Sequence, residues 1–519
     1  MTAAASERAT GLFQERPRAA VVRDLTLRSR SRLEALPAPA LEAVLEDALW
    51  NERNRMRRAR GEDDERDHLE DLAQALVHGD RDAQVTAGLR LVADWADEIH
   101  GRFDPRVYRL ATRLLPRGLS TLLSPRGGRR SPGVVVEGDL DGLRSLSREA
   151  TLVLCPTHVS NLDSPLIGLA LYLAGLPPFV YGAGLNLFDN KLIGWWMHRL
   201  GAYTVDRRKQ ARLYKDVLKD YSVRALTTRH HSLFFPGGTR SRSGQVEQQL
   251  KKGLMGTGIV AWQEMLAAGR PDPNVYFVPL TLSFSLVLEA STLIDDHLSE
   301  AGKQRYIITD DESTQPRRLA AFARRVLDLD AAVIAHFGAP LDVLGDPVSA
   351  DPEERAVQSL DRRAYVCDAD GAVRWDAQRD RVYTDRLASE LGAVYPRYAH
   401  VLPTHVAAYA AWQCLAEDAG SDDPFRLVRL PRARRRLSAE RTLRQTRAVI
   451  ARIRAGATAG RWQADLPDAD EALRIALDHF GRYHRSHALM RSGDDLLIED
   501  PRLCFYYHNR LEFMDRGEK

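Results

Sequence analysis

Cysteine is scarce in this chain of 519 residues, and its four copies are widely scattered. Cys155, Cys367, Cys414 and Cys504 form no closely spaced pair of the kind that binds zinc or an iron–sulfur cluster. They are also too few to build the dense disulfide framework of a small secreted domain. We therefore interpret them as small buried residues of a protein in a reducing cytosol, and we expect no metal site.

Long apolar runs are missing as well. No stretch of about 18 uncharged apolar residues occurs, so the sequence predicts no transmembrane helix. The most apolar region, Ser164 to Tyr181, is interrupted by Gly168 and Gly175 and is better explained as a core helix and a loop. Met1 to Arg18 lacks the apolar segment of a secretory signal. We expect a cytoplasmic protein.

The chain also lacks a large excess of charge, because its net charge is only +3. Its arginines are nevertheless unevenly spread: eight of them, against the single acid Asp104, lie between Arg102 and Arg130. A second basic run extends from Arg426 to Arg454. Either run could contact an anionic membrane surface, and a solvated helix face or local ion pairs explain them as well. No recognition motif for nucleic acid accompanies them, so we expect no nucleic-acid partner.

The pattern of apolar residues divides the chain into three regions. Residues 1–132 are charged and helical, with helical spacing over Leu41 to Arg58 and Leu69 to Ile99. Residues 133–350 alternate short apolar runs with helical stretches, which is typical of an α/β domain with a central mixed, mainly parallel sheet covered by helices. Residues 351–519 are helical again. The expected strands are Val134–Val136, Thr151–Cys155, Phe179–Tyr181, Thr204–Val205, Ser232–Phe235, Val275–Pro279 and Ala332–Phe337.

A histidine and an aspartate follow the second expected strand. His158 stands five positions before Asp163, and Pro165 suits the first turn of the next helix, with Ser164 or Asp163 as its cap. A carboxylate beside an imidazole fixes its tautomer and stabilises its positive charge, as a general base that deprotonates an alcohol requires. This spacing alone arises by chance in many proteins. The prediction of a catalytic pair therefore depends on the blocks that follow.

Two arginine-bearing blocks indicate a phosphate ligand. Arg207 and Arg208 follow Thr204–Val205 after one aspartate, at the carboxyl end of a strand, where open α/β sheets bind ligands. Further on, an apolar strand enters a double-glycine turn whose backbone N–H groups, arginines and hydroxyls could surround an anion. Purely structural explanations are also possible: a surface arginine pair for the first of these blocks and a polar turn for the second. The expected phosphate-binding residues are Arg207, Gly238, Thr239, Arg240, Ser241, Arg242 and Lys252, the last at the start of a possible helix.

Residues that could line an acyl groove are less specific. Pro279 ends the strand Tyr276–Pro279, which is equally well explained as a plain core strand. Between the first two blocks lie candidates for a groove wall or for insertion into a bilayer, although core packing explains them as well: Leu185, Phe188, Ile193, Trp195 and Trp196. His336, in the last expected strand, is interpreted as structural.

These blocks, in this order and at this spacing, resemble the glycerolipid acyltransferase family. Its members move an acyl chain from a thioester to a hydroxyl of glycerol phosphate, dihydroxyacetone phosphate or a lysophospholipid. The resemblance covers roughly residues 150–285. It implies that His158, in the first block, is the catalytic base and that Asp163 is its partner. It identifies the second, third and fourth blocks as Gly201–Arg207, Phe235–Arg242 and Val278–Leu280. Residues 401–410 and 505–511 less specifically resemble the large glycerol-3-phosphate and dihydroxyacetone-phosphate acyltransferases.

The resemblance implies an enzyme that moves a fatty acyl chain from acyl-CoA or acyl carrier protein to glycerol-3-phosphate in phospholipid biosynthesis, without a cofactor. Dihydroxyacetone phosphate or a lysophospholipid as acceptor, or a catalytically degraded lipid-binding regulator, are the alternatives. A serine hydrolase would need a Gly-x-Ser-x-Gly turn, which the sequence lacks. Because the product is a lipid, we expect peripheral attachment to the inner face of the cell membrane, with Arg106 to Arg117 as candidate anchor.

One position departs from the family pattern. In the family, the third block usually carries a glutamate before Gly-Thr-Arg, and here that position is Gly237. From the sequence we expect that a buried carboxylate near the site is missing and that acceptor selectivity is altered.

Overall fold

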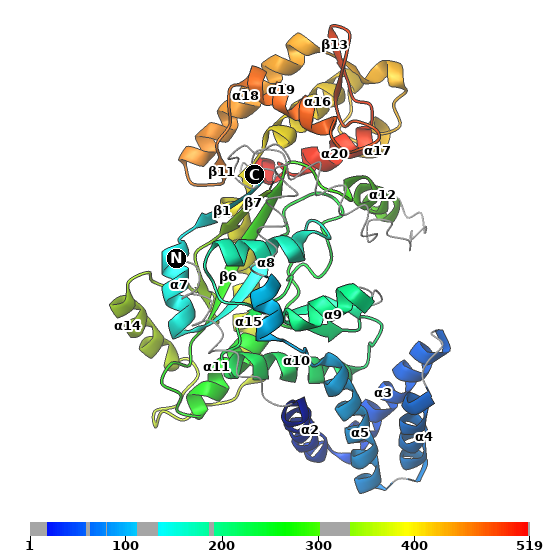
Figure 1. Ribbon diagram of the computed structural model, residues 1–519, viewed down its shortest axis with the longest axis vertical. Helices are drawn as coiled ribbons and strands as arrows, with labels where there is room; N and C mark the ends of the chain where they lie inside the picture. The colour runs from blue at the N-terminus through cyan, green and yellow to red at the C-terminus, as the bar shows by residue number, and fades with distance from the viewer. Residues whose placement is uncertain are drawn as a thin grey trace.

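The computed structural model describes residues 18–58, 63–78, 80–111, 133–185, 191–301 and 333–516. Its centre is an eight-stranded sheet (Figure 1). The strands are β1 (Val134–Gly138), β2 (Thr151–Pro156), β3 (Val180–Gly184), β4 (Ala202–Val205), β5 (Ser232–Leu233), β6 (Val275–Phe284), β7 (Val333–Phe337) and β8 (Leu341–Asp342). Their order is β1-β7-β6-β2-β5-β3-β4, and β8 pairs with β6.

The sheet is mixed and mainly parallel. β6 runs antiparallel to β7 and to β8, whereas every other pairing among these described strands is parallel. All residues of β2 and β6 are buried, as expected for strands covered on both faces. The α/β class and the sheet type expected from the sequence are therefore confirmed.

Helices cover both faces because successive residues of a strand point to opposite sides. Leu152 and Leu154 of β2 belong to a core with α8 (Asp163–Leu173) and α16 (Pro403–Ala419). Val153 faces the other way, into a core with α11 (Thr257–Ala267) and α15 (Ala377–Tyr398). The hydrophobic core thus continues well beyond residue 350. The remaining elements of the domain are α7 (Leu140–Glu149), α9 (Lys191–Arg199), α10 (Arg212–Thr227), α12 (Ala290–Ala301) and α14 (Pro352–Arg363).

The N-terminal region is helical, as expected, and packs against α10 and β4. Its helices are α2 (Arg18–Ala35), α3 (Ala38–Arg58), α4 (Asp63–His78) and α5 (Arg81–Ile99). The periodicity over Leu69 to Ile99 therefore spans two helices, because Asp80 caps α5 by accepting from the N–H groups of Asp82 and Ala83. Residues 105–111 are helical, and the rest of the basic segment that ends at Arg117 lies outside the described residues.

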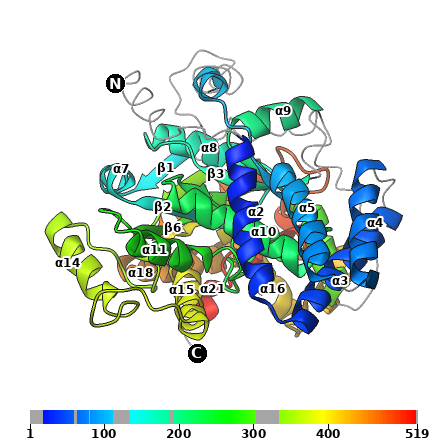
Figure 2. The same ribbon diagram turned by 90° about the horizontal axis from the view of Figure 1, so that it is seen from below.

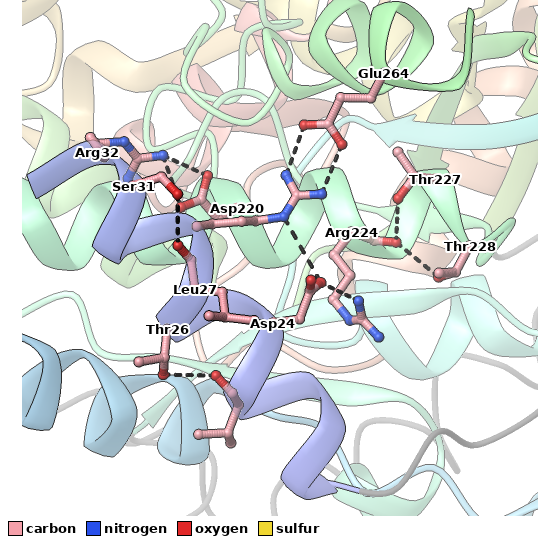
Figure 3. A network of polar contacts seen from close by, with 12 residues as sticks. Asp24, Thr26, Leu27, Ser31, Arg32, Asp220, Arg224, Thr227, Thr228 and Glu264 are labelled. Atoms are coloured by element: carbon pink, nitrogen blue, oxygen red, sulfur yellow. Dashed lines mark hydrogen bonds and ion pairs between the residues drawn. The ribbon is translucent and has the colours of Figure 1, made fainter. Parts of the chain in front are cut away.

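Polar contacts join the N-terminal region to the α/β domain (Figure 3). Figure 2 shows α2 lying across α10. From α2, Arg28 binds both carboxylate oxygens of Glu264 at 2.7 and 2.8 Å, and Arg32 binds Asp220 at 2.8 Å. In the opposite direction, Arg224 of α10 pairs with Asp24 of α2.

The C-terminal region lies at the other end of the molecule from the N-terminal helices (Figure 1). Residues of α16 and α20 belong to the same core cluster as the sheet residues Leu152 and Val278. The elements that complete this region are β9 (His400–Val401), α17 (Pro424–Leu427), a 3-10 turn (Arg432–Arg435), β10 (Arg436–Ser438), α18 (Ala439–Thr458), β11 (Gln463–Ala464), α19 (Ala469–Phe480), β12 (Met490–Ser492), β13 (Asp495–Leu497), α20 (Pro501–Asn509) and α21 (Phe513–Arg516). Among the described helices, none is both long and apolar enough to cross a membrane.

Candidate functional site

His158 and Asp163 meet in the turn between β2 and α8. Imidazole Nδ1 lies 2.7 Å from Asp163 Oδ2. The aspartate side chain is fully buried, whereas 16% of the histidine side chain remains exposed. With Nδ1 held by the carboxylate, Nε2 is the nitrogen that can exchange a proton with a ligand. The structure therefore brings together the pair that the sequence singled out.

Asp163 holds the backbone of the turn as well as the imidazole. Its Oδ2 accepts hydrogen bonds from the N–H groups of Val159 and Ser160 at 2.6 and 3.0 Å. The prediction that Ser164 or Asp163 caps α8 is wrong, because Leu162 occupies the N-cap position and makes no side-chain cap bond. Asp163 is instead the first helical residue, and its carboxylate reaches back into the turn.

Phe235 and Ser241 of the third block hold His158 from outside the turn. The rings of His158 and Phe235 stack with centroids 4.1 Å apart. The Ser241 N–H donates to the carbonyl of His158 at 2.8 Å, and the Ser241 hydroxyl donates to the carbonyl of Gln245 at 2.7 Å. Ser241, expected to bind phosphate, thus links the third block to the first by a backbone hydrogen bond.

Glu289 is a buried carboxylate of the site that sequence reasoning missed. It accepts from the Ser160 hydroxyl at 2.9 Å and from the Asn161 N–H at 2.8 Å, and Arg240 lies 3.4 Å away. Burial raises the pKa of this carboxyl group above its ordinary value, against the opposing effect of its hydrogen bonds and Arg240. The only available signal was an isolated acid within the apolar run 284–290.

The expected phosphate-binding arginines differ in their surroundings. Arg240 is mostly buried against Glu289, and Arg242 pairs with Glu300 at 2.7 Å on the surface. Arg208 is held by both oxygens of Asp206 at 2.9 Å. Arg207, two residues after the end of β4, is exposed and forms no ion pair within the described part of the chain. Its guanidinium is therefore accessible to an anionic ligand.

Of the two lysines after the third block, Lys251 is the one that contacts its turn. Lys252 points to α15, where its Nζ lies 2.8 Å from Asp385 in an exposed pair. Lys251 covers Gly238, because a Cβ atom added at that glycine would lie 2.6 Å from Lys251 Nζ. Gly238 has a φ of 77°, a backbone conformation that favours glycine. The helix expected from Lys252 is α11, which begins only at Thr257.

A buried acidic side chain, that of Glu247, lies beside Gly237. Its Oε1 accepts the N–H of His158 at 2.8 Å. A Cβ atom added at Gly237 would lie 2.5 Å from Glu247 Oε2, so this side chain occupies the space beside the glycine. Burial raises the pKa of Glu247 to about 8. The expectation that no buried carboxylate lies there is therefore wrong.

The C-terminal region contacts the residues around His158 through the end of α20 and the residue that follows it. Asn509 donates to the carbonyl of Ser243 at 2.9 Å, and the buried Arg510 donates to Gly244 at 3.1 Å and Leu282 at 3.3 Å. A small cavity beside His158 is shared by both parts of the chain. Its lining is Thr157, His158, Val159, Ser241, Gln245, Val246, Glu247, Thr281, Leu282, Ser283, Ala399 and Arg510.

The candidates for an acyl groove lie in different environments. Pro279 is buried in β6 opposite Cys155, as in a plain core strand. Trp195 and Trp196 lie on α9, and Trp195 is 44% exposed with Arg199 4.1 Å above its ring. Leu185 directly follows β3, whereas Phe188 and the side chain of Ile193 lie outside what the structure describes.

One cluster has donors that could hold a metal ion. Oxygen of Glu137 and nitrogens of His336 and His400 lie within 4.8 Å of one another, a donor set that zinc accepts. The sequence predicted no such cluster, because the three residues come from β1, β7 and β9. The imidazole nitrogens also lie 3.0 Å apart, at hydrogen-bond distance. None of the three lines the cavity at His158, so we assign them no part in its chemistry.

Comparison with known proteins places this site in a recognised domain. Residues 139–283 match the family model described as Acyltransferase. A glycerol-3-phosphate acyltransferase of Xylella fastidiosa (strain M23) is 28% identical over 194 residues, which are 37% of this chain and 21% of that protein. One from Xanthomonas axonopodis pv. citri (strain 306) is 29% identical over 181 residues, 35% of this chain and 20% of its own length.

A longer but weaker match extends over 257 residues of the glycerol-3-phosphate acyltransferase of Xylella fastidiosa (strain M12), at 27% identity, 48% of this chain and 28% of that protein. The chain thus spans between a fifth and about a quarter of the length of these curated relatives. The crystal structure of the 1-acyl-sn-glycerophosphate acyltransferase from Thermotoga maritima aligns with 50% of this chain and 77% of that chain, at 17% identity and a TM-score of 0.26. On the sequence matches, residues 139–283 are an acyltransferase domain distantly related to glycerol-3-phosphate acyltransferases.

Proposed function

We propose that this protein moves a fatty acyl chain from an acyl thioester to a hydroxyl of glycerol-3-phosphate. The observation that carries the proposal is the partly exposed His158, held by the buried Asp163 on a domain of the acyltransferase family. Glycerol-3-phosphate is favoured as acceptor because the relatives that match bear that name and because Arg240 lies beside the turn that carries His158.

In the proposed reaction, His158 Nε2 takes the proton of the acceptor hydroxyl while Asp163 stabilises the imidazolium. The acceptor oxygen attacks the thioester carbonyl and forms the new ester. The carbon–sulfur bond then breaks, and the departing thiolate of coenzyme A or acyl carrier protein takes the proton back from His158. No metal or cofactor enters these steps.

The arginines and the glycine turn hold the phosphate of the acceptor in this proposal. Arg207 is exposed near the carboxyl end of β4, Lys251 covers the turn at Gly238, and Thr239 is exposed beside it. Arg240 stays beside Glu289, which fixes its side chain near the turn that carries His158. Positioning the hydroxyl in this way can supply several kcal/mol of the rate gain.

We further propose that the protein attaches to the anionic inner face of the cell membrane through the surface beside α9. A cavity there is lined by four arginines, Arg102, Arg106, Arg109 and Arg199. Exposed Leu110 and Trp195 provide apolar contacts next to this charge. Arginines attract anionic lipid headgroups, whereas apolar side chains enter the interface, and one such surface gives weak, reversible binding.

The test is acyl transfer from palmitoyl-coenzyme A to glycerol-3-phosphate by the purified protein and by His158→Ala. We expect kcat to fall about 10³-fold, the usual contribution of a general base. His68→Ala is the matched control, because His68 Nδ1 also lies 2.5 Å from an aspartate, Asp94, but in the N-terminal helices. This control should retain full activity.

Other acceptors and donors separate the alternatives. Turnover only with dihydroxyacetone phosphate or a lysophospholipid would replace the acceptor and keep the chemistry. Turnover only with acyl carrier protein would replace the thioester carrier. The absence of turnover with every combination, together with binding to anionic vesicles, would instead support a lipid-binding regulator that has lost catalysis.

A further inference from the structure

We propose that Glu247 provides, from ten positions further along the chain, the carboxylate that the third block lacks, and that it positions the backbone of His158. The inference rests on the proposed acyltransferase function. It adds a positioning residue that lies outside the four sequence blocks, and it explains why a glycine is tolerated at Gly237.

Glu247 occupies the space that a side chain at position 237 would need. A side chain on Gly237 would start 2.5 Å from Glu247 Oε2 and 2.6 Å from its carboxyl carbon, well inside van der Waals contact. A glutamate at position 237 and the present conformation of Glu247 therefore exclude each other. Only one carboxylate fits beside this turn. In this chain it belongs to Glu247, which lies at the far end of the loop that begins at Pro236.

Glu247 also forms a hydrogen bond to the turn that carries His158. Glu247 Oε1 accepts from the N–H of His158 at 2.8 Å, while the carbonyl of His158 accepts from Ser241. Both backbone polar groups of the proposed base are thus held by the segment that runs from the third block to Glu247. An unpaired buried N–H is costly, so losing this acceptor should let the turn shift.

Arg510, from the C-terminal region, lies at the same place. Its side chain is buried and lines the cavity that His158 and Glu247 also line. Its guanidinium also binds the carbonyl of Gly244, within the loop that connects the third block to Glu247. The loop that ends at Glu247 is therefore held from the C-terminal side beside the cavity at His158.

The experiment moves the carboxylate between the two positions. Glu247→Ala should lower kcat about 100-fold, the scale of a displaced catalytic group, with a smaller change in the KM for glycerol-3-phosphate. Gly237→Glu alone should also lose activity, because two side chains compete for one space. The double variant Gly237→Glu/Glu247→Ala should recover at least tenfold over either single variant, about 1.4 kcal/mol in activation free energy.

Two further variants keep the test falsifiable if Glu247→Ala is poorly folded. Glu247→Gln retains a side-chain carbonyl that accepts from the His158 N–H, so it should keep most of the wild-type kcat. Glu390→Ala, which removes an exposed glutamate of α15, should match the wild type throughout. Wild-type kcat in Glu247→Ala, or a double variant no better than the singles, would overturn the proposal.

A readout without turnover separates this proposal from the proposed function. Hydrogen exchange measured by mass spectrometry should be faster in the peptide that contains His158 for Glu247→Ala, and the double variant should restore the wild-type rate. If the wild type transfers no acyl group but this exchange pattern holds, the positioning role stands and the proposed reaction fails. Unchanged exchange in Glu247→Ala would overturn the positioning role even in an active enzyme.

Discussion

The N-terminal and C-terminal regions are both helical and rich in arginine, yet they relate to the site in opposite ways. The N-terminal helices share a core with α10 and β4, and ion pairs such as Arg28–Glu264 border their contact (Figure 3). The C-terminal helices share the core of the central sheet and place Arg510 behind His158. Similar composition therefore says little about which region supports the proposed chemistry.

The difference is physical as well as positional. Partly exposed ion pairs contribute about 0–1 kcal/mol each, because water and salt screen them and ordering two long side chains costs entropy. A buried cation such as Arg510 is different, since its removal leaves buried carbonyls without a donor. The next three experiments compare the two regions on this basis.

The largest effect is expected from Arg510→Met. The carbonyls of Gly244 and Leu282 lose a buried, charged donor, so we expect unfolding to become easier by about 3 kcal/mol. Chemical denaturation measures this change. Arg502→Met is the matched control in α20, the helix that Arg510 directly follows, because Arg502 forms an exposed pair with Asp295 and should cost less than about 1 kcal/mol. Equal losses in the two variants would contradict the comparison.

Acid should destabilise the C-terminal region next. Burial lowers the pKa of His405 to about 3 and those of His484 and His508 to about 4. Because the folded-state pKa values lie below the unfolded value of about 6.5, the unfolded chain binds more protons in between. Stability is therefore present above pH 6.5 and lost as the pH falls toward 4. Melting temperatures measured from pH 7 to pH 4.5 should fall steadily.

Proteolysis locates the effect of acid along the chain. At pH 5, cleavage by a protease that remains active there should begin after residue 400, because these three histidines lie there, whereas His100 is the described histidine with a similarly lowered pKa beside the N-terminal helices. First cleavage within α2 to α5 would show that the N-terminal contact is the weaker one in acid. His405→Gln should reduce the pH dependence, because its amide stays neutral over this range.

The smallest effect is expected at the N-terminal contact. In a double-mutant cycle with Arg28→Ala and Glu264→Ala, we expect a coupling energy of about 0.5–1 kcal/mol, since both side chains are partly exposed. Acyl transfer should stay within twofold of the wild type in all three variants. A coupling energy above about 2 kcal/mol, or a large loss of kcat, would make this region as integral as the C-terminal one.

Much of the sheet and part of the site could be predicted because their signals are local. Short apolar runs indicated the central strands, and the spacing of His158 and Asp163 placed both in one turn. Glu247, Glu289 and Arg510 could not be predicted in the same way. Each lies far along the chain from the turn it supports, and an isolated charged residue in a sequence does not reveal which backbone N–H or carboxylate it meets.

By itself, the sequence determined the α/β class, the order of the four blocks and the histidine–aspartate pair, because hydrophobic periodicity and short-range spacing depend only on neighbours along the chain. The tertiary structure decided which carboxylate stands beside Gly237, which lysine covers Gly238 and which terminal region reaches His158. Those outcomes depend on burial and on the meeting of distant segments. Only the folded chain brings Glu247 within 2.8 Å of the His158 N–H and buries Arg510 behind them.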